Sequence, residues 1–247
     1  MKITIITVVL NRVNTIREAI ESVLSQDYSN VEYIIVDGGS TDGTLDVINE
    51  YSQRVDKIIS ESNDGMYEAI NRGIELASGD YIGLVHSDDK LENTHVISDI
   101  VRCAKEANAD IVYGDGEYYD DKGRLARKWR GGNFHKWKTF FVWLPLHTAT
   151  YIRRECYLRL GMYDSTFKIA GDTDLLIRFL KENNLNAFYY PHTIIRMRMG
   201  GLSTNRRNRM KVWREDIAVF RKHGLRPAFM YKCMKMLWKV PQIMCKI

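Results

Sequence analysis

The chain has 247 residues, of which 45% are hydrophobic and 27% charged, with only four prolines. This length fits one large domain, alone or with a small appendage, and the composition excludes disordered and fibrous classes. The formal net charge of +5 is unevenly placed, because residues 205–247 hold 12 basic and two acidic residues and the rest hold 24 and 29. We therefore expect an acidic body and a basic tail that meets an anionic surface, either phospholipid headgroups or nucleic acid.

The location of the chain is predicted from its apolar runs and cysteines. The longest apolar run, residues 3–10, is shorter than the ~18 residues that span a bilayer, and it is too short for a signal peptide. The four cysteines form no C-x-x-C pair, so we expect neither a disulfide framework nor a cysteine–zinc site. A reducing cytoplasm is the simplest location for such a chain.

Strands and helices alternate over the first half of the chain. Apolar, β-branched runs predict buried strands at residues 3–9, 33–36, 57–60 and 81–85. Helical patterns follow, starting near residues 14, 44 and 66. This alternation predicts an α/β fold with a parallel sheet and right-handed crossovers, in which ligands bind at the carboxyl ends of the strands.

The pattern loosens after a strand at 109–113. Residues 114–150 are rich in glycine and aromatics, which predicts a substrate platform; the aromatic residues are Trp129, Phe134, Trp137, Phe140, Phe141 and Trp143. Helices are expected at 155–160 and 172–181, and strands at 187–190 and 194–199. Two basic helices should follow from residue 207, broken near Gly224 and by Pro227.

Adjacent carboxylates follow the strand at 81–85. Asp88 and Asp89 at the end of a buried strand are costly unless a cation neutralises them. Hard oxygen ligands favour Mg²⁺ or Mn²⁺, shared with a diphosphate. The alternative is an ordinary surface turn.

Other polar residues follow neighbouring strands and are expected to share this site. Asp37 could accept a hydrogen bond from a base or ribose, although the same turn could start a helix capped by Ser40 or Thr41. Thr7 and Asn11 could line the same slot or only cap the helix from residue 14. Ser87 precedes the paired carboxylates, and we include it in the site.

Asp172 is the candidate general base. It stands before an apolar helical run, so it is either a helix N-cap or a carboxylate that collects a hydroxyl proton. His147 and His192 are weaker candidates, since a lone histidine is usually structural or solvated.

Several motifs that follow one another along the chain resemble those of family 2 glycosyltransferases of the GT-A fold. They are Thr7-Val-Val-Leu-Asn-Arg12, residues 19–26, Glu32 to Thr44 around Val-Asp-Gly-Gly-Ser-Thr-Asp-Gly, and Ala77-Ser-Gly-Asp-Tyr-Ile82 with Ser87-Asp-Asp89. Two more, Asp64-Gly-Met-Tyr-Glu-Ala-Ile-Asn-Arg-Gly73 and Met199-Gly-Gly-Leu-Ser203, look like the bacterial subgroup that builds O-antigen, capsule or exopolysaccharide. The resemblance spans residues 1–205 and does not cover the tail.

The resemblance implies roles for these positions. Asp37 would contact uracil, Asp88 the ribose or metal, and Asp89 would bridge Mn²⁺ or Mg²⁺ to the diphosphate. The residues that complete the implied donor site are Thr7, Asn11, Asp64, Gly65, Asn71 and Ser87. Asp172 falls where the family places its base, but Gly171 replaces the usual preceding Glu and His86 replaces a common Asn. His192 is the nearest match to the family's third metal ligand, a histidine.

The resemblance also implies the reaction and its setting. We expect an inverting, metal-dependent hexosyltransferase that uses a nucleotide sugar, with UDP as the expected nucleotide, and a glycan or lipid-linked acceptor. Residues 1–113 would be the nucleotide-sugar-binding half and 114–205 the acceptor-binding half of a catalytic domain. The departing UDP gains negative charge, which a divalent cation stabilises, while a carboxylate across the pocket takes the acceptor proton.

The tail, residues 206–247, has its own expected partner. In its last helix apolar residues recur at spacings of three and four, and they are Phe229, Cys233, Leu237 (or Met236), Val240, Met244 and Ile247. Lysines fall on another face, namely Lys232, Lys235, Lys239 and Lys246. This pattern predicts peripheral binding to an anionic membrane, or a helix packed on the body with solvated lysines. Pro241 should kink or end the helix.

Two other functions fit parts of the sequence. A nucleotidyltransferase also uses strand-end carboxylates and a metal, but it usually has a glycine-rich loop after its first strand, which residues 7–12 lack. A nucleic-acid binder would explain the basic tail with Trp213 and Trp238, but the acidic body argues against it.

Overall fold

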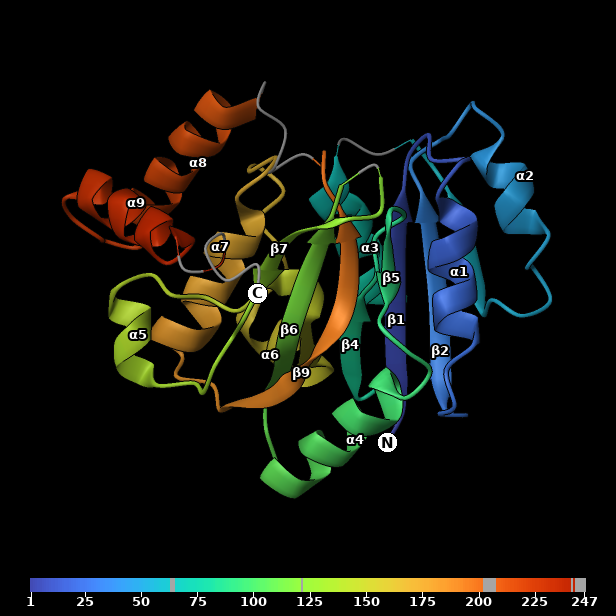
Figure 1. The fold of residues 1–247 in the computed structure, drawn as a ribbon, viewed down its shortest axis with the longest axis horizontal. Helices are drawn as coiled ribbons and strands as arrows, with labels where there is room; N and C mark the ends of the chain where they lie inside the picture. The colour runs from blue at the N-terminus through green and yellow to red at the C-terminus, as the bar shows by residue number, and fades with distance from the viewer. Residues whose placement is uncertain (63–64, 121, 202–207, 241, 243–247) are drawn as a thin grey trace.

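A single mixed sheet runs through the body of the protein in the computed structural model, which describes residues 1–62, 65–120, 122–201, 208–240 and 242 (Figure 1). Its strand order is β3-β2-β1-β4-β8-β6-β9-β5, and β7 pairs with β6. The strands are β1 Ile3–Val9, β2 Val31–Asp37, β3 Lys57–Ser60, β4 Tyr81–Leu84, β5 Asp89–Leu91, β6 Ile111–Tyr119, β7 Leu125–Trp129, β8 Thr150–Arg153 and β9 Ala187–Arg198.

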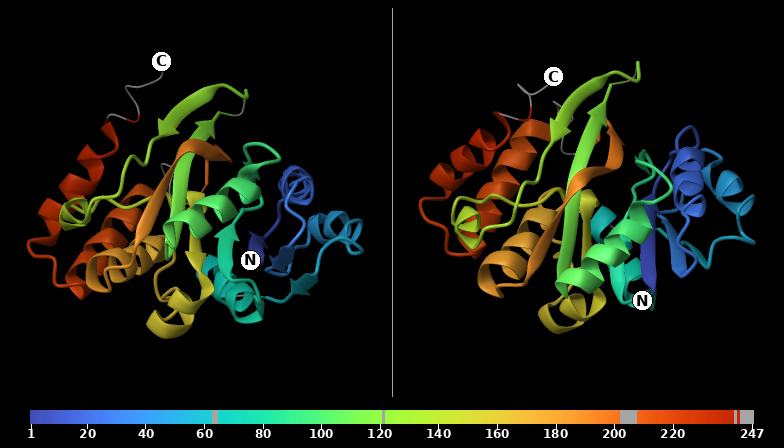
Figure 2. Two further views of the ribbon diagram at one scale, coloured as in Figure 1. Left: turned by 90° about the horizontal axis from the view of Figure 1, so that it is seen from below. Right: turned by 60° about the horizontal axis from the view of Figure 1, so that its bottom comes forward.

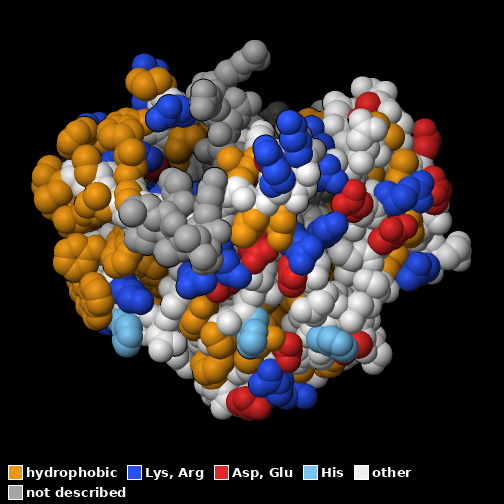
Figure 3. Space-filling model, viewed as in Figure 1, with side chains coloured by type: hydrophobic (Ala, Val, Ile, Leu, Met, Phe, Trp, Pro, Cys, Tyr) orange, Lys and Arg blue, Asp and Glu red, His pale blue; other side chains and the backbone are white. Residues whose placement is uncertain are grey.

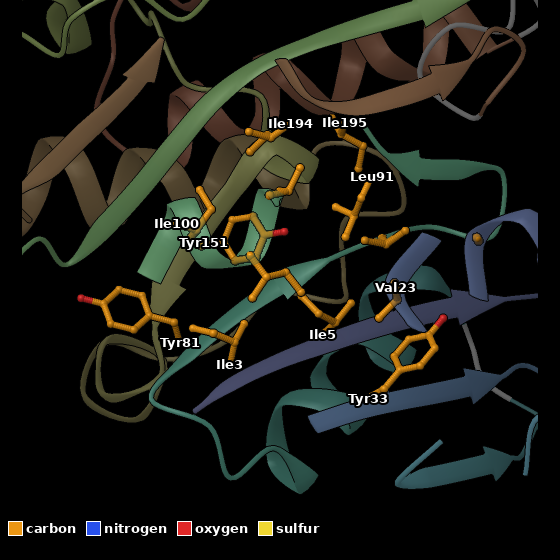
Figure 4. Packing of buried hydrophobic residues seen from close by; sticks show 14 of the residues in the cluster. Ile3, Ile5, Val23, Tyr33, Tyr81, Leu91, Ile100, Tyr151, Ile194 and Ile195 are labelled. Carbon is orange, nitrogen blue, oxygen red and sulfur yellow. The ribbon is translucent and has the colours of Figure 1, made fainter. Parts of the chain in front are cut away.

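The α/β prediction for the first half is confirmed. Strands β3, β2, β1 and β4 are parallel, and the helices between them are α1 Ile16–Leu24, α2 Thr44–Asn49 and α3 Met66–Leu76, with α4 Val96–Ala107 after β5. Strand β1 is buried along its whole length because both faces of the sheet are covered. Its Ile3 and Ile5 pack on the side of α1 and α4, whereas Ile6 packs on the side of α3. Figure 4 shows Ile5 and Val23 in the first of these two cores.

The second half joins the same sheet. The two strands expected at 187–190 and 194–199 are one strand, β9, parallel to β6. The register between them shifts around Asp115, next to Gly114, where a Cβ atom would lie 2.9 Å from the backbone oxygen of His192. Strand β5 was not predicted; it is short and pairs Asp89 with Met197 of β9. Asp89 therefore belongs to a strand and not to a surface turn.

The aromatic segment at 114–150 is only partly what its composition predicts. Trp129 and Trp143 are 6% and 5% exposed and pack with Tyr113, so they build a core and not a substrate platform. The helix α5, Lys136–Phe140, instead leaves Trp137 and Phe140 more than half exposed. The difference arises because composition reports aromatic content and not which side of each backbone segment faces the sheet.

Short helices bring the candidate base to the sheet. They are the 3₁₀ turn η1 His147–Ala149, α6 Arg154–Leu160, α7 Gly171–Leu176 and the π-helical η2 Ile177–Glu182 that continues α7. Ala170 is the N-cap of α7, so Asp172 lies inside the first turn and the N-cap alternative for Asp172 is wrong.

The basic tail forms α8 Arg209–Lys222 and α9 Ala228–Leu237, which lie against the body at the end away from α1 and α2 (Figures 1 and 2). The chain breaks at Gly224, in a left-handed conformation with φ +67°, and at Pro227, as predicted. Val219, Phe220 and Leu225 are buried against residues of the body such as Ile177. The alternative that the tail packs on the body is therefore confirmed for these helices.

The lysines of α9 are not on a solvated face. Lys232 is 5% exposed and donates to Asp216, and the Nζ atom of Lys235 lies 2.7 Å from the same carboxylate. Asp216 is itself 1% exposed, and the pairing outweighs burial and keeps its pKa below the usual range. The expectation that these two lysines face a membrane or water is wrong, because a buried carboxylate on α8 draws them inward.

Glu215 fastens the tail to the loop before α7. Its Oε2 atom accepts hydrogen bonds from the backbone N–H groups of Lys168, Ile169 and Ala170, at 3.0, 2.7 and 3.0 Å. We expect Glu215→Ala to lower the free energy of unfolding by about 1–3 kcal/mol, measured by urea denaturation, because three donors lose a charged acceptor.

Glu215→Gln keeps one acceptor oxygen and should lose less. Glu106→Ala is the control, since Glu106 forms an exposed pair with Arg102 at 3.8 Å, and it should change stability by less than about 0.5 kcal/mol. Equal losses in Glu215→Ala and Glu106→Ala would show that the three bonds add nothing.

Candidate active site

The polar loops gather at one edge of the sheet, as predicted. Strands β1, β2 and β4 are parallel neighbours, with Val9 opposite Asp37 and Ile6 opposite Leu84. The loops that follow them therefore leave the sheet on the same side. This edge holds the loop after β1, the loop after β2 and the Ser87-Asp88 turn.

Asp37 organises the loop after β2. Its side chain is fully buried and accepts hydrogen bonds from the Oγ of Ser60 at 2.7 Å and the backbone N–H of Ser40 at 3.0 Å, and the Ser40 hydroxyl also donates to it. The expected cap at Ser40 or Thr41 is wrong, because Gly43 with φ +93° is the N-cap of α2. Asp37 is thus a buried acceptor that fixes the conformation of the loop after β2.

Thr7 and Asn11 have structural partners. The Thr7 hydroxyl is buried, 2.9 Å from the hydroxyl of Tyr33, and the Asn11 Oδ1 atom accepts from the backbone N–H of Thr41 at 2.9 Å. Neither caps α1, whose N-cap is Thr15, so that alternative is wrong. Asn11 ties the first two strand-end loops together.

The other residues expected to contact the nucleotide-sugar donor lie at different places in the structure. Ser87 is buried beside the paired carboxylates. Gly65 is the N-cap of α3, with φ +150°, and Asp64 lies outside the described residues. The Asn71 amide is occupied: it donates to the backbone oxygen of Tyr163 at 2.8 Å and accepts from the Tyr163 N–H at 2.9 Å.

Asp88 and Asp89 line a cavity of about 350 Å³. The other residues around it include Glu18, Tyr119, Arg196 and Arg198. Asp89 is 7% exposed, and burial together with the neighbouring Asp88 charge raises its pKa well above the usual range. Over the described ranges, neither carboxylate accepts a hydrogen bond or forms an ion pair.

This pair has the chemistry of a cation site. Two unneutralised carboxylates in a cavity fit Mg²⁺ or Mn²⁺, which usually takes one or two carboxylates and completes its shell with water and substrate phosphate. Among the residues that the structure describes, no group of three or more His, Cys, Asp or Glu side chains could hold a metal by itself. The residues present therefore fit a metal that the substrate helps to bind.

A histidine pair links this turn to Asp172. The Nε2 atoms of His86 and His147 are 3.3 Å apart, and the Nδ1 atom of His147 is 3.7 Å from Oδ2 of Asp172. Burial lowers the pKa of His147, an effect that Asp172 partly opposes. His147 therefore contacts the candidate base, although the sequence made it only one of two weaker candidates for the site.

Tyr118 is near enough to both candidate catalytic carboxylates for their charges to affect its phenol. Burial raises the pKa of its phenol to about 12; the Arg127 charge lowers it, and the charges of Asp89 and Asp172 raise it further. The Arg127 guanidinium stacks over the Tyr118 ring, 4.9 Å from its centroid. The charges of both carboxylates therefore raise the pKa of the same phenol, although Asp89 comes from β5 and Asp172 from α7.

His192 is not placed to be a third metal ligand. It is exposed on β9, where its ring is tilted against that of Tyr190 with 4.7 Å between the centroids, on the side of Asp99 of α4. The expectation for His192 is wrong because β9 carries it along the α4 face of the sheet, whereas the edge with Asp89 is reached only at Met197.

The structure explains Gly171 before the candidate base. A Cβ atom there would lie 2.8 Å from the ring of Tyr67, whose hydroxyl accepts from the backbone N–H of Asp172 at 3.2 Å. We expect Gly171→Ala to lower the free energy of unfolding by about 1–3 kcal/mol in a denaturant titration, because the ring must move.

Gly201→Ala is the matched control, since no atom of the described residues lies within 4 Å of its added Cβ. It should be close to neutral. If Gly171→Ala left the free energy of unfolding unchanged, the Tyr67 ring would be shown to move aside without loss of stability.

Comparisons with known proteins identify the class. The family model described as Glycosyl transferase family 2 matches residues 4–169. The chain therefore belongs to glycosyl transferase family 2 and is a glycosyltransferase, which removes both alternative functions considered from the sequence.

Relatives of known sequence carry the same general activity in their names. A PGL/p-HBAD biosynthesis glycosyltransferase of Mycobacterium bovis is 29% identical over 206 residues, covering 81% of this chain and 78% of that protein. Glycosyltransferase GlyG of Streptococcus pneumoniae is 31% identical over 140 residues, covering 56% of this chain but only 44% of that protein.

Solved structures confirm the GT-A fold. S. aureus TarS residues 1–349 in complex with UDP-GlcNAc superimposes with a TM-score of 0.67 at 17% identity, covering 83% of this chain and 60% of that chain. The mannosyltransferase PcManGT of Pyrobaculum calidifontis, in complex with GDP-Man and Mn²⁺, gives 0.65 at 16% identity, covering 98% and 73%. In longer TarS the match covers only 37% of that chain.

Proposed function

We propose that this glycosyltransferase is metal-dependent and inverts the anomeric configuration of a sugar taken from a nucleotide sugar, with UDP as the favoured nucleotide. The observation that carries the proposal is a pair of carboxylates from different elements, Asp89 of β5 and Asp172 of α7, on the two sides of the His86–His147 contact; the Nε2 atoms of the histidines are 3.3 Å apart, and His147 Nδ1 is 3.7 Å from Asp172 Oδ2. An in-line displacement needs such a pair, with leaving-group charge on one side of the sugar and a base on the other. Neighbours that bind UDP-GlcNAc and GDP-Man support the donor class.

In this proposal the Asp88-Asp89 turn binds the donor end. Asp89, with Asp88 beside it, would hold Mg²⁺ or Mn²⁺, which when bound stabilises the negative charge of the departing diphosphate. Asp37 and Asn11 fix the loops that would surround the base and ribose. Ser87 and Gly65 would complete this side. Thr7 would act indirectly, through its contact with Tyr33 of β2, and Asn71 through the backbone of Tyr163 that it holds.

Asp172 would take the acceptor proton at one defined oxygen. Its Oδ1 atom accepts from the backbone N–H of Thr173 at 2.7 Å, whereas Oδ2 faces His147 at 3.7 Å. The acceptor hydroxyl would therefore approach Oδ2, and His147 would keep that oxygen oriented by a weak, adjustable contact. A third of the Asp172 side chain is exposed, so an acceptor can reach it.

We extend the proposal to the acceptor, a glycan hydroxyl of a lipid-linked oligosaccharide used for cell-surface polysaccharide such as O-antigen, at the cytoplasmic face of a membrane. The order of motifs in residues 64–73 and 199–203 supports this choice. The described helices include none that is long and apolar enough to cross a bilayer.

The test is thermal denaturation with a panel of UDP- and GDP-sugars in Mn²⁺ or in chelator, followed by a transfer assay with the best stabiliser. We expect a UDP-sugar to raise the melting temperature with Mn²⁺ and much less with chelator, and NMR of the product to show an inverted anomeric centre. A retained configuration, or transfer unaffected by chelator, would overturn the mechanism.

A further inference from the structure

The last helix of the chain presents its apolar side to solvent. Phe229 and Leu237 of α9 are 62% and 67% exposed, whereas Lys232 and Lys235 point inward to Asp216. In an ordinary surface helix the apolar stripe faces the core and the lysines face water. Here the orientation is reversed, so the exposed stripe is not needed to pack the helix on the body.

The body contributes a second apolar element beside this stripe. Trp137, Phe140 and Phe141, on and next to α5, are 54%, 54% and 43% exposed. The Trp238 indole N–H donates to the backbone oxygen of Phe141 at 3.0 Å, which places the end of α9 beside α5. We call the combined surface the apolar face; it consists of Trp137, Phe140, Phe141, Phe229, Met230, Met236, Leu237 and Val240.

The apolar face is broad and has basic surroundings. In Figure 3 hydrophobic side chains gather over α5, α8 and α9, with Lys and Arg at their margins. Residues 208–240 hold nine basic and two acidic residues. The two acids, Glu215 and Asp216, are bound to the loop before α7 and to the inward lysines. What this segment shows to solvent is therefore apolar and positive, as with exposed Arg226 and Lys239.

We propose that the apolar face is a docking surface for an anionic lipid bilayer. Aromatic and aliphatic side chains would enter the boundary between headgroups and acyl chains, and the surrounding cations would meet lipid phosphate. The charge separates this occupant from a second copy of the chain, since two such faces brought together would place like charges side by side.

Docking would orient the site. Lys235 of α9 donates to the Oγ1 atom of Thr173 at 2.6 Å, so the docked helix contacts the residue next to Asp172. The use of this arrangement rests on the proposed function: a bilayer bound at α5 and α9 would bring a lipid-linked acceptor toward the base. The docking itself needs only the surface.

The experiment is flotation of the full chain with vesicles of phosphatidylglycerol and phosphatidylcholine in equal parts, or of phosphatidylcholine alone. We expect binding to the anionic vesicles, at least tenfold weaker binding to the neutral ones, and loss with rising salt. The variant Phe140→Ser/Leu237→Ser should lose at least tenfold in binding. Leu158→Ser, equally exposed at 63% but on α6, should bind like the wild type.

The other outcomes overturn the proposal. Equal binding of the double variant and Leu158→Ser, with unchanged melting temperatures, would exclude the apolar face. A dimer in light scattering that Leu237→Ser dissociates, without vesicle binding, would assign the face to a second copy. Failure of the proposed function is seen separately, as absence of donor-dependent stabilisation in a protein that still floats.

Discussion

Asp89→Asn is expected to reduce sugar transfer about a thousandfold without lowering the stability of the metal-free protein. In the proposed mechanism the activity would fall because the amide would bind the cation that stabilises the leaving diphosphate more weakly, a contribution of several kcal/mol. The stability should not fall, because Asp89 is 7% exposed and its carboxylate has no partner in the described part of the chain. The measurements are kcat with excess Mn²⁺ and the melting temperature in chelator.

The pKa of Asp89 gives the sign of the stability change. Since the folded-state pKa is raised, the charged form is disfavoured in the native protein, and stability decreases as the pH rises above the ordinary carboxyl range near 4. An amide does not ionise, so Asp89→Asn should melt at or above the wild-type temperature at neutral pH in chelator.

The control for Asp89 lines the same cavity. Asp120 is held by Arg124, with its Oδ2 atom 2.9 Å from the Arg124 Nε, so it is not available to a metal in the same way. Asp120→Asn should keep transfer within a few-fold of wild type. Equal losses in Asp89→Asn and Asp120→Asn would point to the shape of the cavity instead of a metal ligand.

The strands that carry the site could be predicted because their signals are local. The apolar run of β1 is one short stretch of sequence, and the turn after β2 is another. Parallel pairing of β1 and β2 then brings the carboxyl ends of the two strands to one edge of the sheet. The gathering of Asp37 and Asp88 at that edge needed no knowledge of side-chain contacts.

The other residues near the candidate catalytic carboxylates gave no such signal. Tyr118, Arg127 and His147 come from β6, β7 and η1, and only the antiparallel packing of the second half brings them together. No spacing in the sequence relates them to Asp172. For the same reason the sequence could not show that His192, its nearest match to a third metal ligand, is carried elsewhere by β9.

The orientation of the tail also could not be predicted from the periodicity of its apolar residues. Helical periodicity finds the two faces of α9 but does not say which one faces the body. The choice depends on Asp216, a buried carboxylate 16 and 19 residues from the lysines that it binds. A buried charge requires a partner, and this requirement outweighs the usual preference for burying the apolar face.

Asp172→Asn should separate binding from chemistry. We expect transfer to fall about 10²- to 10⁴-fold, because the amide cannot accept the proton of the acceptor hydroxyl. Stabilisation by the donor with Mn²⁺ should be unchanged, since Asp172 lies on α7 and the proposed metal ligands lie at the start of β5. The Thr173 N–H bond to Oδ1 can persist with the amide oxygen, so the loop should keep its shape.

Asp164→Asn is the matched control for Asp172. Asp164 lies before the same helix, but its carboxylate is bound to Lys222 at 2.8 Å and not to the histidine pair. It should lose at most about 1 kcal/mol of stability and keep its transfer rate. If Asp172→Asn transferred sugar as fast as Asp164→Asn, the proton would have to leave by another route, and His147, 3.7 Å from Asp172, would be the next residue to replace.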